Sequence, residues 1–120
     1  MRLPETRTMR PGQVNTNDFE AAILERIASN DALLKPLIGK LHVLSRTYTG
    51  VGSFTNFACS ETVVELGDHA FGLSSLIRMP GVPNGMGAVL FCKSGKPECL
   101  ETFTYGDDHW EGVHEGFSIE

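Results

Sequence analysis

A single segment, GAVLFCKSGKPECLETFTY (residues 87–105), carries the clearest signal for the fold. It holds two β-forming runs, GAVLFCK and ECLETFTY, on either side of Ser94-Gly95. A small polar residue followed by glycine between two such runs is a strong signal for a hairpin turn. The stretch therefore predicts two antiparallel strands, and the segments before it are interpreted as their neighbours.

The segments upstream repeat the two-residue period of a strand. LHVLSRTY (41–48) has two alternating sets of side chains, one on each face: Leu41, Val43, Ser45 and Thr47 against His42, Leu44, Arg46 and Tyr48. Further strand candidates are SFTNFACS (53–60), TVVEL (62–66) and LSSLIRM (73–79). Together these segments predict an antiparallel meander sheet of four to six strands.

Two helices are predicted ahead of the strands. Asn17 is a good N-cap, and Glu20 completes a capping-box pair with it. Apolar residues then recur at helical spacing: Phe19, Ala22, Ile23 and Ile27, with Leu24 beside them. A shorter helix is predicted over 31–38, where Pro36 lies in the first turn or marks a break. Two N-terminal helices packed on the meander make a two-layer α+β fold.

Length and composition are those of an ordinary globular domain, with 120 residues, 41% apolar and 21% charged. Residues 1–15 show no periodicity and are interpreted as a flexible N-terminal arm, and residues 16–120 as a single α+β domain. No apolar run approaches the ~20 residues that span a bilayer, and the first residues lack the apolar region of a secretory signal. We expect a cytoplasmic protein without membrane association.

Charge is distributed unevenly along the chain, whose net charge is −5. No Lys or Arg follows Lys96, and that last segment carries seven acidic residues: Glu98, Glu101, Asp107, Asp108, Glu111, Glu115 and Glu120. A phosphate backbone would repel such a surface, so nucleic-acid binding is not expected. An acidic end suits a basic protein partner, although a solvated acidic tail is the simpler interpretation.

Motifs for catalysis and for cofactors are weak. A strand-forming run follows Thr49-Gly50-Val51-Gly52, so the two glycines indicate a turn or bulge and not a phosphate loop, which needs a helix after it. Cys59, Cys92 and Cys99 lack metal spacing and are interpreted as free, mostly buried thiols. No cofactor is expected.

A metal site is a weak alternative. Asp107, His109 and His114 are ligand types within one short segment, but a spacing of five does not place the two histidines on one face of a helix. The alternative interpretation is a polar loop anchored by Trp110.

Glu101 and Arg46 form the other candidate site. Glu101 shares a strand face with Cys99, Phe103 and Tyr105, and if that face is the core, the carboxylate needs a partner. Arg46 is the partner that we expect, in a pair that either stabilises the core or faces a ligand. The Gly/Pro-rich segment 79–87, with Asn84-Gly85, is predicted to be a long loop beside it. The candidate binding residues are Arg46, Glu101, Tyr105, Trp110 and Asn84.

Two blocks, SRTYTGVGSFTNF (45–57) and GMGAVLFCKSGKPECLETFTYGDDHW (85–110), resemble a group of small uncharacterised bacterial proteins. The shared patterns are R-x-[YF]-T-G-V-G-x-[FY]-T-x-F and a C-terminal L-E-x-[FY]-T-Y-G-x-x-x-W. The resemblance covers roughly the C-terminal two-thirds of the chain and implies that Arg46, Glu101, Tyr105 and Trp110 belong to a shared pattern. It implies no activity. Ser53 stands where an aromatic residue is usual.

The sequence therefore favours a small non-catalytic interaction protein of the inhibitor or immunity type, which uses its acidic surface to bind a basic partner. The alternative is a small-molecule binding protein or enzyme with a pocket near Arg46, Glu101 and the 79–87 loop. A homodimer through an open sheet edge is a further hypothesis.

Overall fold

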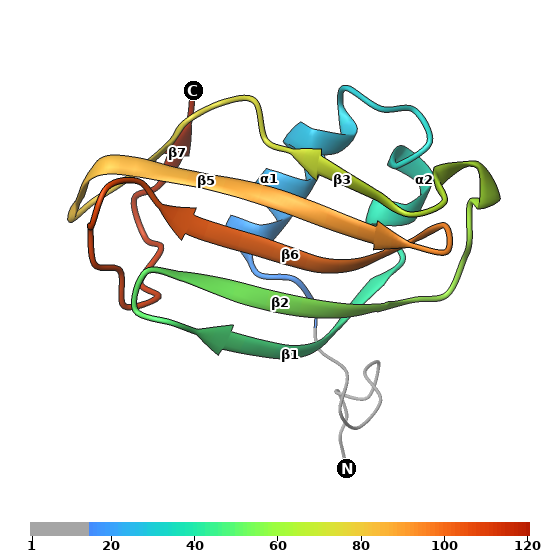
Figure 1. The fold of residues 1–120 in the computed structure, drawn as a ribbon, viewed down its shortest axis with the longest axis horizontal. Coiled ribbons are helices and arrows are strands. Elements are labelled where there is room, and N and C mark those ends of the chain that lie inside the picture. The colour runs from blue at the N-terminus through green and yellow to red at the C-terminus, as the bar shows by residue number, and fades with distance from the viewer. Residues whose placement is uncertain (1–14) are drawn as a thin grey trace, which may run out of the picture.

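The computed structural model describes residues 15–120, and its fold is α+β (Figure 1). The helices are α1 (Asp18–Ala28), α2 (Lys35–Ile38) and the single 3₁₀ turn η1 (Val64–Leu66). The strands are β1 (Leu41–Tyr48), β2 (Gly52–Cys59), β3 (His69–Gly72), β4 (Ile77–Met79), β5 (Val82–Lys93), β6 (Lys96–Thr104) and β7 (Ser118–Ile119). Apart from Asn15, the arm predicted over residues 1–15 lies outside the described residues.

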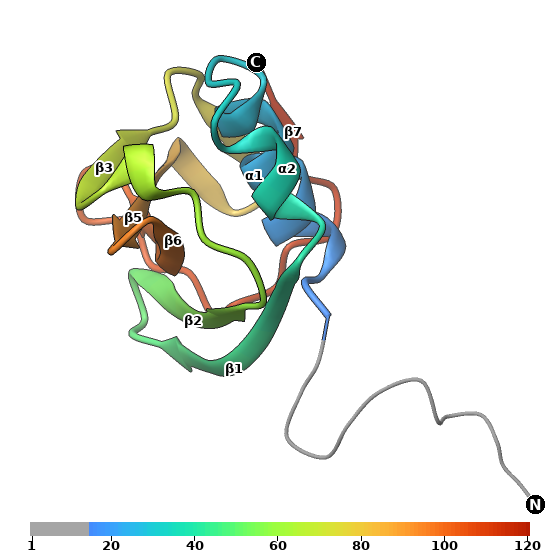
Figure 2. The same ribbon diagram turned by 90° about the vertical axis from the view of Figure 1, so that its right-hand side faces the viewer.

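The seven strands form one antiparallel sheet, in the order β1-β2-β6-β5-β4-β7. Strand β3 also pairs with β5, along residues 89–92, whereas β4 pairs with its residues 82–86. The prediction of four to six strands was therefore too low. The two additional strands, β3 and β7, are short, and their residues carry no clear alternation of apolar and polar side chains. Figure 2 shows α1 and α2 on one side of the sheet; we call this the inner face, and the opposite side the outer face.

Helix α1 begins as its sequence predicts. The side chain of Asn17 accepts a hydrogen bond from the backbone of Glu20, whose carboxylate accepts one from the backbone of Asn17. The pair satisfies two of the N–H groups that a helix start leaves without partners. Helix α2 is shorter than predicted because Pro36 lies in its first turn, where a missing N–H costs nothing.

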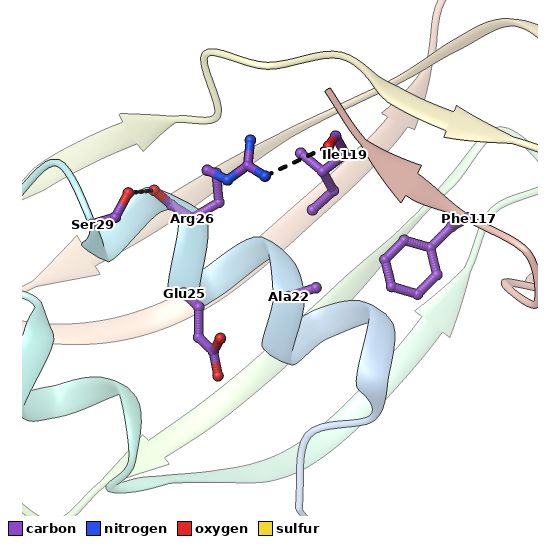
Figure 3. Close-up of a pocket in the computed structure, with 6 residues that line it drawn as sticks. All are labelled: Ala22, Glu25, Arg26, Ser29, Phe117 and Ile119. Carbon is purple, nitrogen blue, oxygen red and sulfur yellow. Dashed lines mark hydrogen bonds between the residues drawn. The ribbon is translucent and has the colours of Figure 1, made fainter.

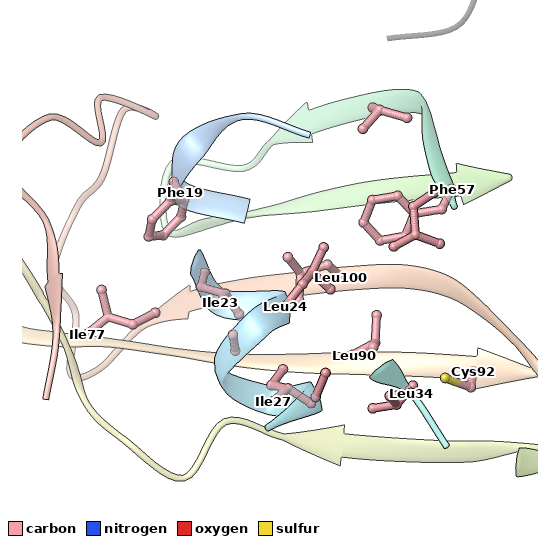
Figure 4. Packing of buried hydrophobic residues seen from close by; sticks show 14 of the residues in the cluster. Phe19, Ile23, Leu24, Ile27, Leu34, Phe57, Ile77, Leu90, Cys92 and Leu100 are labelled. Carbon is pink, nitrogen blue, oxygen red and sulfur yellow. The ribbon is translucent and has the colours of Figure 1, made fainter. Parts of the chain in front are cut away.

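The core lies between α1 and the inner face of the sheet. Ile23, Leu24 and Ile27 of α1 point toward Leu90 of β5 and Leu100 of β6 (Figure 4). All five side chains are buried. Burying one such side chain stabilises the fold by roughly 1.5–3 kcal/mol relative to leaving it exposed, so this layer is a large part of what fixes α1 on the sheet.

A β-bulge in β1 changes which residues of that strand face the core. Val43 pairs with Phe57 and Ser45 with Asn56, so Leu44 is one residue more than β2 can match. After an unpaired residue, the alternation of side chains shifts by one. The core face therefore holds Val43 before the bulge and Arg46 after it, and the prediction of one uninterrupted alternation was wrong.

Two other predicted segments differ in the structure. TVVEL is not a strand, since its last three residues form η1. The segment 79–87 is not a long loop, because β4 ends at Met79 and β5 begins at Val82. Only Pro80 and Gly81 connect the two strands, and Gly81 has a φ of 82°, which glycine adopts without steric cost. The hairpin at Ser94-Gly95, in contrast, is confirmed between β5 and β6.

None of the helices in the described part of the chain is long and apolar enough to cross a membrane. The three cysteines are free, as predicted, with Cys59 and Cys92 buried and Cys99 partly buried.

Candidate interaction surface

The partner of Arg46 is Glu20 of α1, and the predicted pair of Arg46 with Glu101 was wrong. The guanidinium donates from Nε to Oε2 of Glu20 over 2.7 Å and from Nη2 to Oε1 over 2.8 Å. Its Nη2 also donates to the carbonyl of Asn15. This pair connects the start of α1 to β1. Its two N–H···O bonds are bidentate, which is the strongest hydrogen-bonding geometry between an arginine and a carboxylate.

Glu20 is a buried carboxylate whose hydrogen bonds all come from the protein. Besides Arg46, the backbone N–H of Asn17 donates to Oε1 and the hydroxyl of Thr55 donates to Oε2 over 2.9 Å. Burial alone would raise the pKa of Glu20, but the bonds from Arg46, Asn17 and Thr55 together hold that pKa below its ordinary value. A carboxylate with this many donors is committed to structure, and it leaves no position for a ligand.

The register of the sheet explains why Glu101 is not part of this network. Arg46 lies opposite Thr55 in β2, and Thr55 lies opposite Leu100 in β6, so these three share the inner face. Glu101 follows Leu100 and therefore belongs to the outer face. Arg46 and Glu101 therefore lie on opposite sides of the sheet and cannot line one pocket together.

The glycine turn at the β1–β2 hairpin holds the C-terminal segment in place. The N–H of Thr49 donates to the carbonyl of Gly52 over 3.0 Å, and Gly50 has a φ of 88°, as a turn requires. The carbonyl of Gly50 accepts a hydrogen bond from the N–H of Trp110 over 2.8 Å. The predicted turn is confirmed, and its second task is to hold the segment that carries Trp110.

Trp110 anchors the C-terminal segment on the inner side of the sheet. Its ring lies 5.7 Å from that of Phe19 and 5.8 Å from that of Tyr48, centroid to centroid. Its indole N–H donates to the carbonyl of Val113, so the buried ring leaves no polar atom without a partner. The prediction that Trp110 anchors this loop is confirmed.

Asn84 joins the start of β5 to the same segment. Its backbone N–H donates to Oδ2 of Asp108 over 2.8 Å, and its side-chain amide donates to Oδ1 over 3.2 Å. Asp108 thereby accepts two hydrogen bonds from neutral groups, and neither donor offsets its negative charge. Of the five predicted binding residues, the structure brings Asn84 and Trp110 to one region, through Asp108.

A groove of about 370 Å³ lies in this region, between the β4–β5 hairpin and the segment 108–113. We call it the hairpin groove. One wall consists of Pro80, Gly81, Val82 and Pro83, and the other of Asp108, His109, Trp110, Glu111 and Val113. The hairpin wall lies within the segment 79–87, which was predicted to border a pocket, whereas Glu111 was not among the predicted binding residues.

The charged groups of the hairpin groove are acidic. The side chains of Glu111 and His109 are 76% and 66% exposed, and His109 Nε2 lies 3.4 Å from Oε2 of Glu111. The lining contains no Lys or Arg. A lining that combines prolines, valines and Trp110 with two carboxylates is suited to a basic side chain whose carbon chain lies in the groove.

A second groove, of about 410 Å³, lies between α1 and β7 (Figure 3). Its lining includes Phe117 and Ile119 on one side and Ala22 and Arg26 on the other. The guanidinium of Arg26 already donates to the carbonyl of Glu120 and to Ser75. Glu25 also lines this groove and is exposed, so its charged lining combines one carboxylate with an arginine that already binds the C-terminal strand.

The weak metal alternative has no support in the geometry of the chain from residue 15 onward. Over that range no group of three or more His, Cys, Asp and Glu side chains is placed to hold a metal ion. His114 stacks on the ring of Phe19 at 5.7 Å and serves the packing of the segment. Asp107 and His109 are exposed.

Comparison of the chain with models of protein families, with curated proteins and with solved structures finds no match in any of the three. The resemblance to the group of small bacterial proteins stays a prediction. The unusual Ser53 is buried in the structure, where its hydroxyl lies 2.6 Å from that of Thr102.

Proposed function

We propose that this chain is a non-catalytic interaction protein that binds a basic segment of a partner protein in the hairpin groove. The observation that carries the proposal is that Asp108 and Glu111 line a groove together with apolar residues, while no Lys or Arg of residues 15–120 lines it. A Lys or Arg side chain fits both features, since its carbon chain covers apolar surface and its charge meets a carboxylate.

The wider charge pattern supports the same proposal. The chain has no Lys or Arg after residue 96, so Asp108 and Glu111 are the charged carboxylates of that wall and no Lys or Arg of the segment offsets them. Complementary charge of this kind accelerates association and selects basic partners, and salt weakens it. The walls are supported by the Asp108–Asn84 bonds and by buried Trp110, so little order is lost when a partner binds.

A fluorescence titration tests the proposal, because Trp110 is the only tryptophan and lines the groove. We expect tetra-arginine to change the emission of Trp110 saturably at low salt, and tetraglutamine to leave it unchanged. Glu111→Gln should weaken binding about threefold, the usual scale of one exposed charge pair. Glu115→Gln is the matched control, since Glu115 is exposed and does not line the groove. Equal affinity for the Arg and Gln peptides, or equal effects of the two variants, would refute the proposal.

A further inference from the structure

The outer face of the sheet carries aromatic side chains and is not covered by any described element. Figure 2 shows the helices on the inner side alone, and in Figure 1 the same outer face is turned toward the viewer. Phe54, Phe91 and Tyr105 are 38%, 39% and 44% exposed. Soluble proteins rarely leave several large apolar side chains together on one face without a binding role.

The sheet register places Phe54, Val89 and Phe103 around the carboxylate of Glu101. Glu101 lies directly opposite Phe54 of β2 on one side and Val89 of β5 on the other. Phe103 lies two residues along the same strand and therefore on the same face. Directly opposite residues in an antiparallel pair have Cβ atoms about 4.5–5.5 Å apart, which is close enough for their side chains to surround one group.

Phe103 and Tyr105 pack on each other over a glycine of the neighbouring strand. Their rings meet edge to face with centroids 5.6 Å apart. A Cβ added to Gly87 would lie 2.5 Å from the Tyr105 hydroxyl and 2.8 Å from the Phe103 ring, so both side chains occupy the space above that glycine. These two rings therefore support each other and Gly87 in one part of the outer face.

Glu101 has no partner in this setting. Within residues 15–120 it forms neither an ion pair nor a side-chain hydrogen bond. A carboxylate beside aromatic rings offers a cation two attractions, the charge of the carboxylate and the negative faces of the rings. An ammonium or guanidinium group satisfies both, and a neutral apolar group satisfies neither.

We propose that this outer face binds an extended segment of a partner protein that places one Lys or Arg side chain over Glu101, with apolar side chains on the surrounding rings. The occupant is argued from charge complementarity. A second copy of the chain, stacked face to face about a two-fold axis near the centre of the sheet, would bring two Glu101 carboxylates together at a cost. The proposal is independent of the hairpin groove, which uses other residues.

The test is a two-dimensional NMR titration of the full chain with a short blocked peptide, Leu-Val-Arg-Val-Leu, and with the same peptide carrying Gln in place of Arg. We expect the Arg peptide to shift the amide signals of Phe54, Val89, Glu101 and Phe103 at millimolar concentration. It should bind about fivefold more tightly than the Gln peptide, which is the scale of one cation–aromatic contact near a surface.

Two variants separate the proposal from a general charge effect. Glu101→Gln should lower the affinity for the Arg peptide to that of the Gln peptide. Glu98→Gln is the matched control, because Glu98 is an exposed residue of β6 that lines a groove with Phe57 and Cys59 of the inner side, and it should leave binding unchanged. Phe91→Ala should weaken binding of both peptides, since Phe91 supplies apolar surface to either one.

Several outcomes would overturn the proposal. They are an absence of shifts at millimolar peptide, shifts confined to residues 108–113, equal affinity for the two peptides, or no effect of Glu101→Gln. A dimer in light scattering that Phe91→Asp converts to monomer would show that the outer face pairs with a second copy instead. Shifts on the outer face without a change in Trp110 emission would support this proposal and at the same time refute binding in the hairpin groove.

Discussion

Replacing Glu20 by Gln should destabilise the fold by about 2–3 kcal/mol. Glutamine keeps one carbonyl oxygen for Asn17 and for Nη2 of Arg46, but it presents an amide where Oε2 now accepts from Arg46 Nε and from Thr55. Losing a hydrogen bond to a charged group costs roughly 1.5–3 kcal/mol. Removing one partner of a fully buried ion pair costs about 3–5 kcal/mol, and the Arg46 side chain is 25% exposed, so water recovers part of that loss.

The assay is thermal and urea unfolding at pH 7, with Glu25→Gln as the matched control. Glu25 lies on the same helix and is exposed, and its replacement should stay within about 0.5 kcal/mol. For a chain of this length, 2–3 kcal/mol corresponds to a fall in Tm of about 8–12 °C. A Tm of Glu20→Gln within 2 °C of the control, a shift worth about 0.5 kcal/mol, would refute the structural role of the network.

The pH dependence of the same variant supplies an independent check. The pKa of Glu20 is lowered from 4.5 in the folded protein, so its contribution to stability is present above pH 4.5. That contribution is lost as the pH falls through the lowered folded pKa, because the native state must then bind a proton that it resists. We expect the stability difference between wild type and Glu20→Gln to shrink below pH 4.5. A difference that stays constant from pH 7 to pH 3 would contradict this account.

Three further outcomes are expected. Gly87→Ala should destabilise the fold by about 1–3 kcal/mol in urea unfolding, because the added Cβ would meet the Phe103 ring. Gly72→Ala is the control, since a Cβ there would meet nothing within 4 Å and should not destabilise the fold. Equal effects of the two variants would contradict the contact at Gly87. Burial raises the pKa of Cys92 to about 11, so this thiol should stay unreactive toward a thiol reagent at pH 8 in the folded protein and react in denaturant, and rapid native labelling would disprove it. Light scattering should give a monomer of 13.1 kDa at micromolar concentration, because the bulge at Leu44 twists the open edge of β1 away from edge-to-edge pairing. A dimer that a proline in β1 converts to monomer would show that this edge does pair with a second copy.

Local signals in the sequence predicted the elements well. The capping pair of Asn17 and Glu20, the turn at Ser94-Gly95 and the turn after Tyr48 each depend on residues close together in the chain, and each is present in the structure. The short strands β3 and β7 were missed because neither carries an alternating pattern. Each forms because a longer strand, β5 or β4, offers a free edge beside it.

The partner of Arg46 was harder to predict. The unpaired Leu44 shifts the alternation of β1 by one residue, and this shift decides which face of the sheet Arg46 lies on. Nothing local to Leu44 announces the bulge that turns Arg46 toward the core. Without that bulge Arg46 would share the outer face with Glu101, and the predicted pair would be reasonable. Glu20 was identified only as a helix cap. It follows the buried Phe19, however, so its carboxylate could also have been expected to bind an arginine from the sheet.

Because Arg46 binds Glu20 and not Glu101, the carboxylate of Glu101 stays on the outer face without an arginine partner. Arg46 is committed to Glu20, and Arg26 and Arg78 are committed to the C-terminal strand, where Arg26 binds the carbonyls of Ile119 and Glu120 and Arg78 binds the Glu120 side chain. The arginines of the described chain therefore serve the inner face and the sheet edge, and none neutralises Glu101. A carboxylate left among aromatic side chains adds nothing to the core, and a charge on an apolar sheet face disfavours stacking of identical copies. The same arrangement that keeps this face from pairing with itself makes it selective for a cationic side chain, so a Glu101→Leu variant should gain self-association while losing affinity for the Arg peptide. A variant that loses only its monomeric state, or only its preference for the Arg peptide, would separate the two effects and count against the link between them.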